Sequence, residues 1–112
     1  MLYHERLDVY HCAIDFLAFT YSIVDTIPRG YGSLADQLKR AAISIPLNIT
    51  EGAGKTTLAD QSRFYAHARG SAMECSAILD VLRVLNTVAE QQLDTNKKLL
   101  VRIVSMLSKI CV

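Results

Sequence analysis

Apolar side chains recur at helical spacing in four segments of the chain, over residues 7–27, 33–52, 57–88 and 94–112. Steps of three and four residues place these side chains on one face of an α-helix. No stretch alternates β-branched and polar residues strongly enough to favour a strand. The pattern predicts an all-α fold. The short turns between segments favour an antiparallel up-down-up-down four-helix bundle that occupies residues 1–112 as a single domain.

The first predicted helix carries two neighbouring apolar rows, which together indicate a broad buried face. One row has heptad spacing and comprises Leu7, Tyr10, Ile14, Leu17, Tyr21 and Val24, and the flanking row comprises Val9, Ala13, Phe16, Ile23 and Ile27. The helix is expected to end near Ile27, because Pro28 disfavours helical geometry in the residue before it. Gly30 and Gly32 then suit a turn.

The second predicted helix contains a proline. Ser33 and Asp36 form a capping box that is expected to open this helix, and the glycines of residues 52–54 are expected to close it. Pro46 removes one amide and crowds the preceding turn, yet the apolar period continues on both sides of it. We therefore expect a kink at Pro46 and not a break.

The third and fourth helices have capping signals of the same kind. Thr57 and Asp60 resemble a second capping box at the start of the third helix, which is expected to extend to about Val88. Asp94 or Thr95 is expected to cap the fourth helix.

A polar row lies directly beside the apolar row of the second helix, and the third helix carries a similar row. The first row is Gln37, Arg40, Ser44, Asn48 and Glu51, and the second is Arg63, His67, Gly70 and Glu74. A solvated helix face would explain both rows.

The alternative is a polar network between these two helices. Arg40 would pair with Glu74 or Glu51, and Asn48 would bind the carbonyls that the proline leaves free. The small residues at positions 70 and 71 would let the two backbones approach closely. The network would comprise Gln37, Arg40, Ser44, Asn48, Glu51 and Glu74.

Composition is that of a folded protein, with 51% hydrophobic and 21% charged residues and a net charge of +1. Such a small charge lacks the strong field of dedicated nucleic-acid binders. The charge is nevertheless uneven, because residues 1–28 carry four acidic side chains against Arg6 alone. Residues 92–112 carry Lys97, Lys98, Arg102 and Lys109 against Asp94. This asymmetry can build a basic face on the fourth helix.

The longest uncharged runs, residues 16–24 and 41–50, are about half of the roughly 20 residues that span a bilayer. The first residues show no basic-then-apolar export signal. We therefore expect no membrane partner and a cytoplasmic location.

The cysteines and histidines do not suggest a metal or cofactor site. Their spacing fits neither a disulfide framework nor a metal knuckle, and the positions are Cys12, Cys75, Cys111, His4, His11 and His67. We expect the cysteines to be buried thiols that act as small hydrophobes, with no cofactor and no bound metal.

Residues 52–57 resemble half of a phosphate-binding P-loop, but the first glycine of that motif would fall at Ile49 and a helix precedes the segment. A glycine C-cap followed by an N-cap explains the segment better. A weaker hypothesis lets the amides that start the third helix, with Lys55, contact a phosphate. No nucleophile with a histidine base is visible, so we expect no catalytic residues and no enzyme.

The second helix also carries a specific motif, which reads Gln37-Leu-Lys-Arg-Ala-Ala-Ile-Ser-Ile-Pro-Leu-Asn-Ile-Thr-Glu-Gly52. It resembles the QLxRAAxSIPxNIxEG signature of the bacterial four-helix-bundle proteins encoded in intervening sequences of 23S ribosomal RNA genes. The similarity continues, without a gap, through Gly54-Lys55, Phe64, Ala68, Gly70-Ser71 and Glu74. It extends more loosely to Leu7-Asp-Val-Tyr10 and Ile27-Pro28.

This resemblance implies a cyclic homopentamer with a central channel. The related accessory variability determinant proteins of diversity-generating retroelements partner a reverse transcriptase and bind nucleic acid through a basic surface. The leading hypothesis is therefore a non-enzymatic accessory protein that binds RNA or DNA, and the alternative is a protein-interaction scaffold without direct nucleic-acid binding. The candidate phosphate-binding residues are Lys39, Arg40, Lys55, Arg63, Lys97, Lys98 and Arg102.

Overall fold

The computed structural model describes residues 1–110, and within them it contains helices and no strand. The long helices are α1 (Asp8–Ile23), α2 (Gly32–Ala53), α3 (Leu58–Leu85) and α4 (Glu90–Ile110). Three short 3-10 helices, η1 (Tyr3–Arg6), η2 (Val24–Thr26) and η3 (Arg29–Tyr31), flank α1 and lead into α2. The all-α four-helix fold predicted from the sequence is confirmed.

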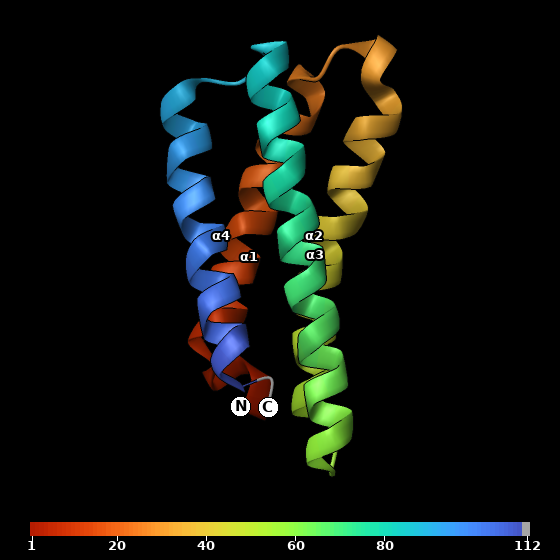
Figure 1. Ribbon diagram of the computed structural model, residues 1–112, viewed down its shortest axis with the longest axis vertical. Coiled ribbons are helices and arrows are strands. Elements are labelled where there is room, and N and C mark those ends of the chain that lie inside the picture. The colour runs from red at the N-terminus through yellow and green to blue at the C-terminus, as the bar shows by residue number, and fades with distance from the viewer. Residues whose placement is uncertain (111–112) are drawn as a thin grey trace.

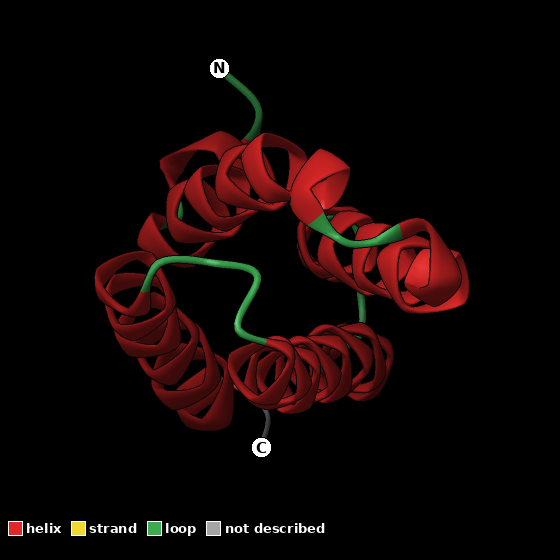
Figure 2. Cartoon of the chain, turned by 90° about the horizontal axis from the view of Figure 1, so that it is seen from above, coloured by secondary structure: helices red, strands yellow, loops and turns green. Residues whose placement is uncertain are grey.

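The chain ascends along α1, descends along α2, ascends along α3 and descends along α4 (Figure 1). Seen from above, the four helices surround a common interior (Figure 2). α1 and α3 each pack against both α2 and α4, so α2 and α4 occupy opposite corners of the bundle. One cluster of buried side chains, drawn from all four helices, forms the core.

The buried face of α1 differs from a heptad seam. Phe16 and Ala13 of the flanking row are fully buried, whereas Ile14 and Tyr21 of the heptad row are 39% and 50% exposed. The flanking row, together with Cys12, therefore faces the core, and the heptad row lies at its edge. The α-helix also ends at Ile23, and η2 continues the chain towards Pro28 in tighter turns.

The predicted capping box at the start of α2 is wrong. The helix already begins at Gly32, its N-cap is Tyr31, and no side chain caps it. Ser33 therefore lies inside the first turn. At the other end, the amide of Gly54 donates to the carbonyls of Thr50 and Glu51, so the predicted glycine end is confirmed.

α2 continues through Pro46 as one helix, as predicted. Pro46 and its neighbour Ile45 are both buried. A kink at this position stays a prediction.

Both helices beside the α3–α4 connection differ from their predicted bounds, because α3 ends earlier and α4 begins earlier than expected. α3 ends at Leu85, because Asn86 adopts a left-handed conformation with φ 55° and its amide closes the last turn. α4 begins at Glu90, so the predicted caps at Asp94 and Thr95 are wrong. The guanidinium of Arg83 instead ties the two helices together, through hydrogen bonds to Glu90 and to Asp94 at 3.0 Å.

The predicted cap of α3 is present. The hydroxyl of Thr57 accepts a hydrogen bond of 3.2 Å from the amide of Asp60 and so satisfies one of the free donors at the helix start.

Thr57→Ala is expected to lower the free energy of unfolding by about 1 kcal/mol, because the capped amide loses its acceptor. Urea denaturation followed by far-UV circular dichroism measures the change. Thr56→Ala is the matched control, since Thr56 is exposed just before the cap and its loss should cost less than about 0.5 kcal/mol. Equal losses in both variants would contradict a capping role.

No helix within residues 1–110 is both long enough and apolar enough to cross a bilayer. Cys12 and Cys75 are buried free thiols, as expected. The remaining cysteine, Cys111, lies outside the described residues.

Candidate functional site

The polar row of α2 contacts α3 through Ser44, which meets Ser71, a neighbour of the α3 polar row. The hydroxyls of Ser44 and Ser71 are 2.8 Å apart, and the side-chain amide of Asn48 donates to the Ser44 hydroxyl at 2.8 Å. Asn48 also donates to the Ser44 carbonyl at 2.8 Å. The carbonyl that loses its helical partner at Pro46 is that of Ala42, so Asn48 does not serve the acceptor predicted for it.

The outer part of the predicted network is not connected within one copy of the chain. Among residues 1–110, Arg40 makes no ion pair with Glu74 or Glu51, and neither Arg40 nor Glu74 has any other polar partner. Glu51 instead pairs with Lys55 at 3.7 Å. Gln37 is exposed at the upper end of the row. The network therefore reduces to the serine pair and Asn48. Arg40 and Glu74 are opposite charges that stay exposed beside it.

The close approach of α2 and α3 occurs at Gly52 and not at Gly70. A Cβ atom added to Gly52 would lie 2.7 Å from the ring of Tyr65, so only glycine fits there without a shift of the ring. A Cβ atom on Gly70 would meet nothing within 4 Å. The prediction that position 70 brings the backbones together is wrong, and Gly70 faces open space.

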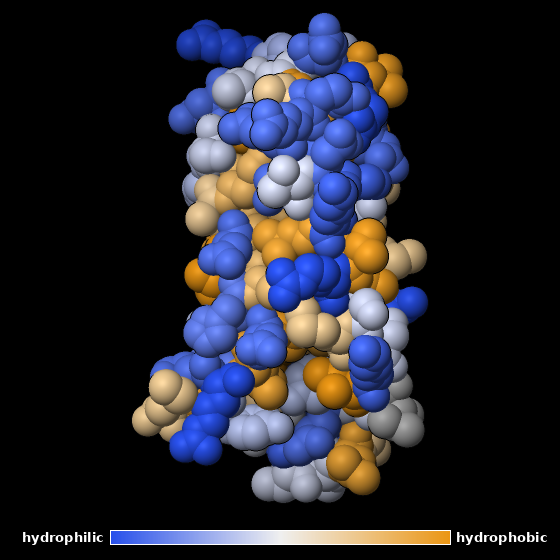
Figure 3. Space-filling view, turned by 90° about the vertical axis from the view of Figure 1, so that its left-hand side faces the viewer, coloured by the Kyte–Doolittle hydropathy of each residue, from blue (hydrophilic) through white to orange (hydrophobic). Residues whose placement is uncertain are grey.

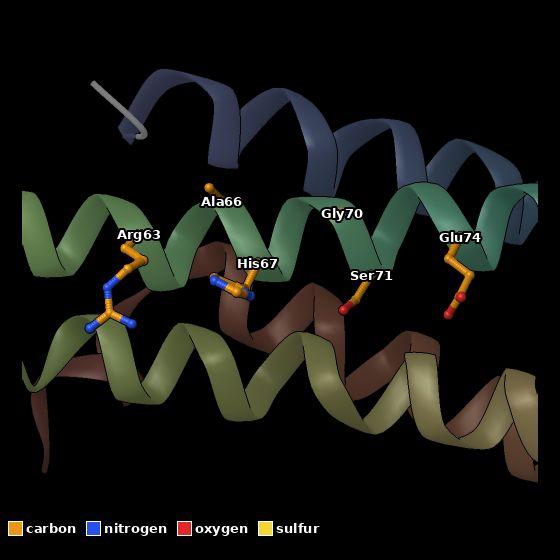
Figure 4. Close-up of a pocket in the computed structure, with 6 residues that line it drawn as sticks. All are labelled: Arg63, Ala66, His67, Gly70, Ser71 and Glu74. Carbon is orange, nitrogen blue, oxygen red and sulfur yellow. The ribbon is translucent and has the colours of Figure 1, made fainter.

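An open groove of about 510 Å³ runs along the outside of α3, and Gly70 is part of its lining. Figure 4 shows the side chains of Arg63, His67, Ser71 and Glu74 pointing towards α2, with Ala66 on the opposite edge of the groove. One end of the groove thus carries a cation and the other end a carboxylate. A second open groove, of about 620 Å³, follows α2 and is bordered by Tyr21 of α1 and by Arg40 and Leu47.

Four of the seven candidate phosphate-binding residues already contact an acidic side chain. Their ion pairs are Lys39–Asp36 at 3.5 Å, Lys55–Glu51 at 3.7 Å, Arg63–Asp60 at 3.5 Å and Lys97–Asp80 at 2.7 Å. Lys97 is held most firmly, because it also donates to the hydroxyl and carbonyl of Ser76. Lys55 and Arg63 in addition lie over the ring of Phe64.

The other three candidates, Arg40, Lys98 and Arg102, are exposed and have no acidic partner within residues 1–110. Lys98 and Arg102 lie one turn apart on α4, and Lys109 follows seven residues later on the same side of the helix. The sequence placed Lys109 in the basic face of the fourth helix, but the candidate phosphate-binding residues did not include it. Arg40 lies on α2, at the opposite corner of the bundle.

The face of the bundle on the α4 side is chemically mixed. Hydrophilic side chains cover much of it, but apolar side chains interrupt them near the middle and lower end (Figure 3). Any phosphate contact on this face would therefore be a local stripe and not a continuous basic surface.

The segment between α2 and α3 has the geometry of two caps. Gly54 ends one helix and Thr57 opens the next, and the carbonyl of Lys55 accepts a hydrogen bond of 2.9 Å from the side chain of Gln61. The interpretation as a C-cap followed by an N-cap is confirmed.

Burial raises the pKa of the Cys75 thiol to about 12, and the nearby charge of Glu74 adds to this shift. The thiol stays protonated near neutral pH, whereas nucleophilic attack requires the thiolate. Within residues 1–110, no three histidine, cysteine or acidic side chains gather in a way that could hold a metal ion.

Comparison with known proteins agrees with the motif in α2. The family model of the 23S rRNA-intervening sequence protein matches residues 5–109, whereas no curated protein matches the sequence. The resemblance inferred from residues 37–52 is thereby confirmed. Because the match covers almost the whole chain, the protein belongs to the 23S rRNA-intervening sequence protein family.

Proposed function

We propose that this protein is a non-enzymatic, oligomeric bundle of the cytoplasm that binds RNA or DNA through the outer side of α4. The supporting observation is the stripe of Lys98, Arg102 and Lys109, which are exposed and have no acidic partner within residues 1–110. Cations without a partner can replace the counterions of a phosphate backbone, whereas paired cations must first give up their carboxylates. The contact is with the backbone and carries no base sequence.

Assembly of several copies would place several of these stripes on one particle. A single copy offers three free cations on α4, whereas the homopentamer implied by the family resemblance would present five such stripes on one particle. Linked sites bind a long strand together, so modest affinity for each stripe adds up to useful avidity.

The double variant Lys98→Ala/Arg102→Ala is expected to weaken nucleic-acid binding by about tenfold at low salt, because two phosphate contacts are lost. The same variant should flatten the plot of log affinity against log salt by about 1.4–1.8. Fluorescence anisotropy with labelled single-stranded RNA and duplex DNA, on nuclease-treated protein, measures both quantities. The matched control is Lys39→Ala/Lys55→Ala, which removes the same charge from cations that already have partners.

Two results would contradict this proposal. One is wild-type protein that retains neither RNA nor DNA at low salt. The other is a control variant that loses as much affinity as the α4 variant, which would indicate a response to net charge alone.

The alternative function is a protein-interaction scaffold, for example for a reverse transcriptase. It is supported by the near-neutral charge and by an apolar groove of about 280 Å³ between α3 and α4. Met73 and Val101 on its edges are 51% and 67% exposed. Pull-down from the native host after nuclease treatment separates the two functions, because a scaffold keeps its protein partner when the nucleic acid is digested.

A further inference from the structure

The outer surfaces of α2 and α3 contain features that have no explanation within a single copy of the chain. Leu47 on α2 is 60% exposed. Gly70 lies in the middle of α3 and faces open space, although a glycine there costs about 1 kcal/mol relative to alanine. Arg40 and Glu74 are opposite charges without partners within residues 1–110. These features belong to the groove on α3 and to a row of exposed side chains on α2, called the ridge below, which comprises Arg40, Leu47 and Glu51. Arg40 and Leu47 also border the groove of about 620 Å³ that follows α2 towards α1.

The ridge and the groove are at the same heights along the bundle. The hydrogen-bonded pair of Ser44 and Ser71 marks a common level, and α2 descends while α3 ascends (Figure 1). At about 1.5 Å per residue, Arg40 lies about 6 Å above that level and Glu74 about 4.5 Å above it.

Below the serine level, the residues of the ridge and of the groove also lie at similar heights. Leu47 lies about 4.5 Å below the serine level, between Gly70 at about 1.5 Å and Ala66 at about 7.5 Å below it. Glu51 and Arg63 are about 10 and 12 Å below the same level. His67, which also lines the groove, is about 6 Å below that level. From top to bottom, the ridge carries a cation, a leucine and a carboxylate, and the groove carries a carboxylate, the glycine gap with the His67 ring below it, and a cation.

A rotation axis parallel to the bundle leaves the height of every residue unchanged. Copies of the chain related by such an axis therefore bring the ridge of one copy level with the groove of the next. Arg40 and Glu74, which have no partner in their own copy, then meet each other. Glu51 and Arg63, each of which already has an ion pair in its own copy, lie at matching levels, and the exposed leucine meets the gap at Gly70 beside His67.

We propose that the ridge of Arg40, Leu47 and Glu51 packs into the α3 groove of a second copy of this chain, with Arg40 paired to the partner's Glu74. This inference rests on the oligomeric part of the proposed function and identifies the surface that forms the oligomer. A nucleic acid fits this surface poorly, because the two cations and two carboxylates at its ends cancel. The small residues of the groove allow the helix backbones of two copies to approach closely.

The first test places a charge on the ridge at Leu47 or a large side chain in the groove at Gly70. Leu47→Glu and Gly70→Leu are each expected to raise the dissociation constant of the assembly at least tenfold, measured by light scattering after size-exclusion chromatography. The Cβ atom of a side chain at position 70 meets nothing within 4 Å in its own copy and the residue is exposed, so the circular dichroism of Gly70→Leu should stay helical. Leu58→Glu is the control, because Leu58 is 81% exposed at the start of α3, outside the ridge and the groove.

The second test exchanges the charges. Arg40→Glu and Glu74→Arg are each expected to weaken the assembly, and the double variant should recover most of the loss, because the ion pair is restored with its direction reversed. A double variant that is additive would overturn the pairing of Arg40 with Glu74.

The outcomes distinguish this inference from the proposed function. If the wild-type protein runs as single copies, the oligomeric proposal itself fails. If the wild-type protein assembles and both Leu47→Glu and Gly70→Leu assemble equally well, only the ridge-and-groove contact is overturned. RNA binding by the α4 stripe is measured separately, on single copies.

Discussion

Phe16→Ala is expected to lower the free energy of unfolding by about 3–5 kcal/mol, because it leaves a large cavity in the centre of the bundle. Phe16 is fully buried in α1 and belongs to the core cluster to which all four helices contribute. Domains of this size have only about 5–15 kcal/mol of total stability. The variant should therefore unfold at a much lower urea concentration than the wild-type protein, with the transition followed by far-UV circular dichroism.

Tyr21→Ala is the control for this prediction. It removes an aromatic side chain of similar size from the same helix, but Tyr21 is half exposed. We expect a loss of about 1 kcal/mol or less, since little apolar surface leaves the core. Equal losses for the two variants would show that the heptad row is buried after all.

The comparison of Phe16 with Tyr21 also shows what the spacing of apolar residues could establish about α1. Both apolar rows repeat at steps of three and four, so the sequence indicated a helix with a wide apolar face. It did not indicate which half of that face points inward, because this depends on where α2 and α4 lie. Thr20 illustrates the difficulty, since it is fully buried although it is polar.

Capping signals were reliable only where the chain leaves no competing way to begin a helix. Thr57 follows a glycine helix end and caps α3 as predicted. Ser33 and Asp94 are equally good capping residues by type, but a local 3-10 turn leads directly into α2 at Gly32, and α4 begins at Glu90. Arg83 of α3 binds both Glu90 and Asp94 at the start of α4, and local sequence did not reveal this contact between helices.

The candidate site was predictable as a set of residue types and not as a set of contacts. The sequence predicted seven cations as possible phosphate ligands by residue type, and four of them have carboxylates within reach, either a few residues away in the chain or on a neighbouring helix. The Lys39, Lys55 and Arg63 pairs lie three or four residues apart and were readable from spacing. The Lys97–Asp80 pair crosses from α4 to α3, so only the fold reveals it.

Gly52→Ala is expected to destabilise the protein, whereas the same substitution at Gly70 is expected to stabilise it. At Gly52 the new Cβ atom would lie 2.7 and 2.9 Å from two ring carbons of Tyr65 and 3.2 Å from the Gln61 carbonyl. Overpacking of this kind costs about 1–3 kcal/mol. Gly70→Ala meets no atom within 4 Å and should gain up to about 1 kcal/mol, because alanine favours the helix.

Both variants should be compared by urea denaturation at a concentration where size-exclusion chromatography shows single copies, since Gly70 also lies in the proposed contact between copies. The cause of the Gly52 effect is tested by a double-mutant cycle with Tyr65→Ala, which removes the ring that the new methyl group would strike. In that background Gly52→Ala should cost little. If the cost is unchanged without the ring, the glycine is needed for the end of α2 itself and not for the approach of α3.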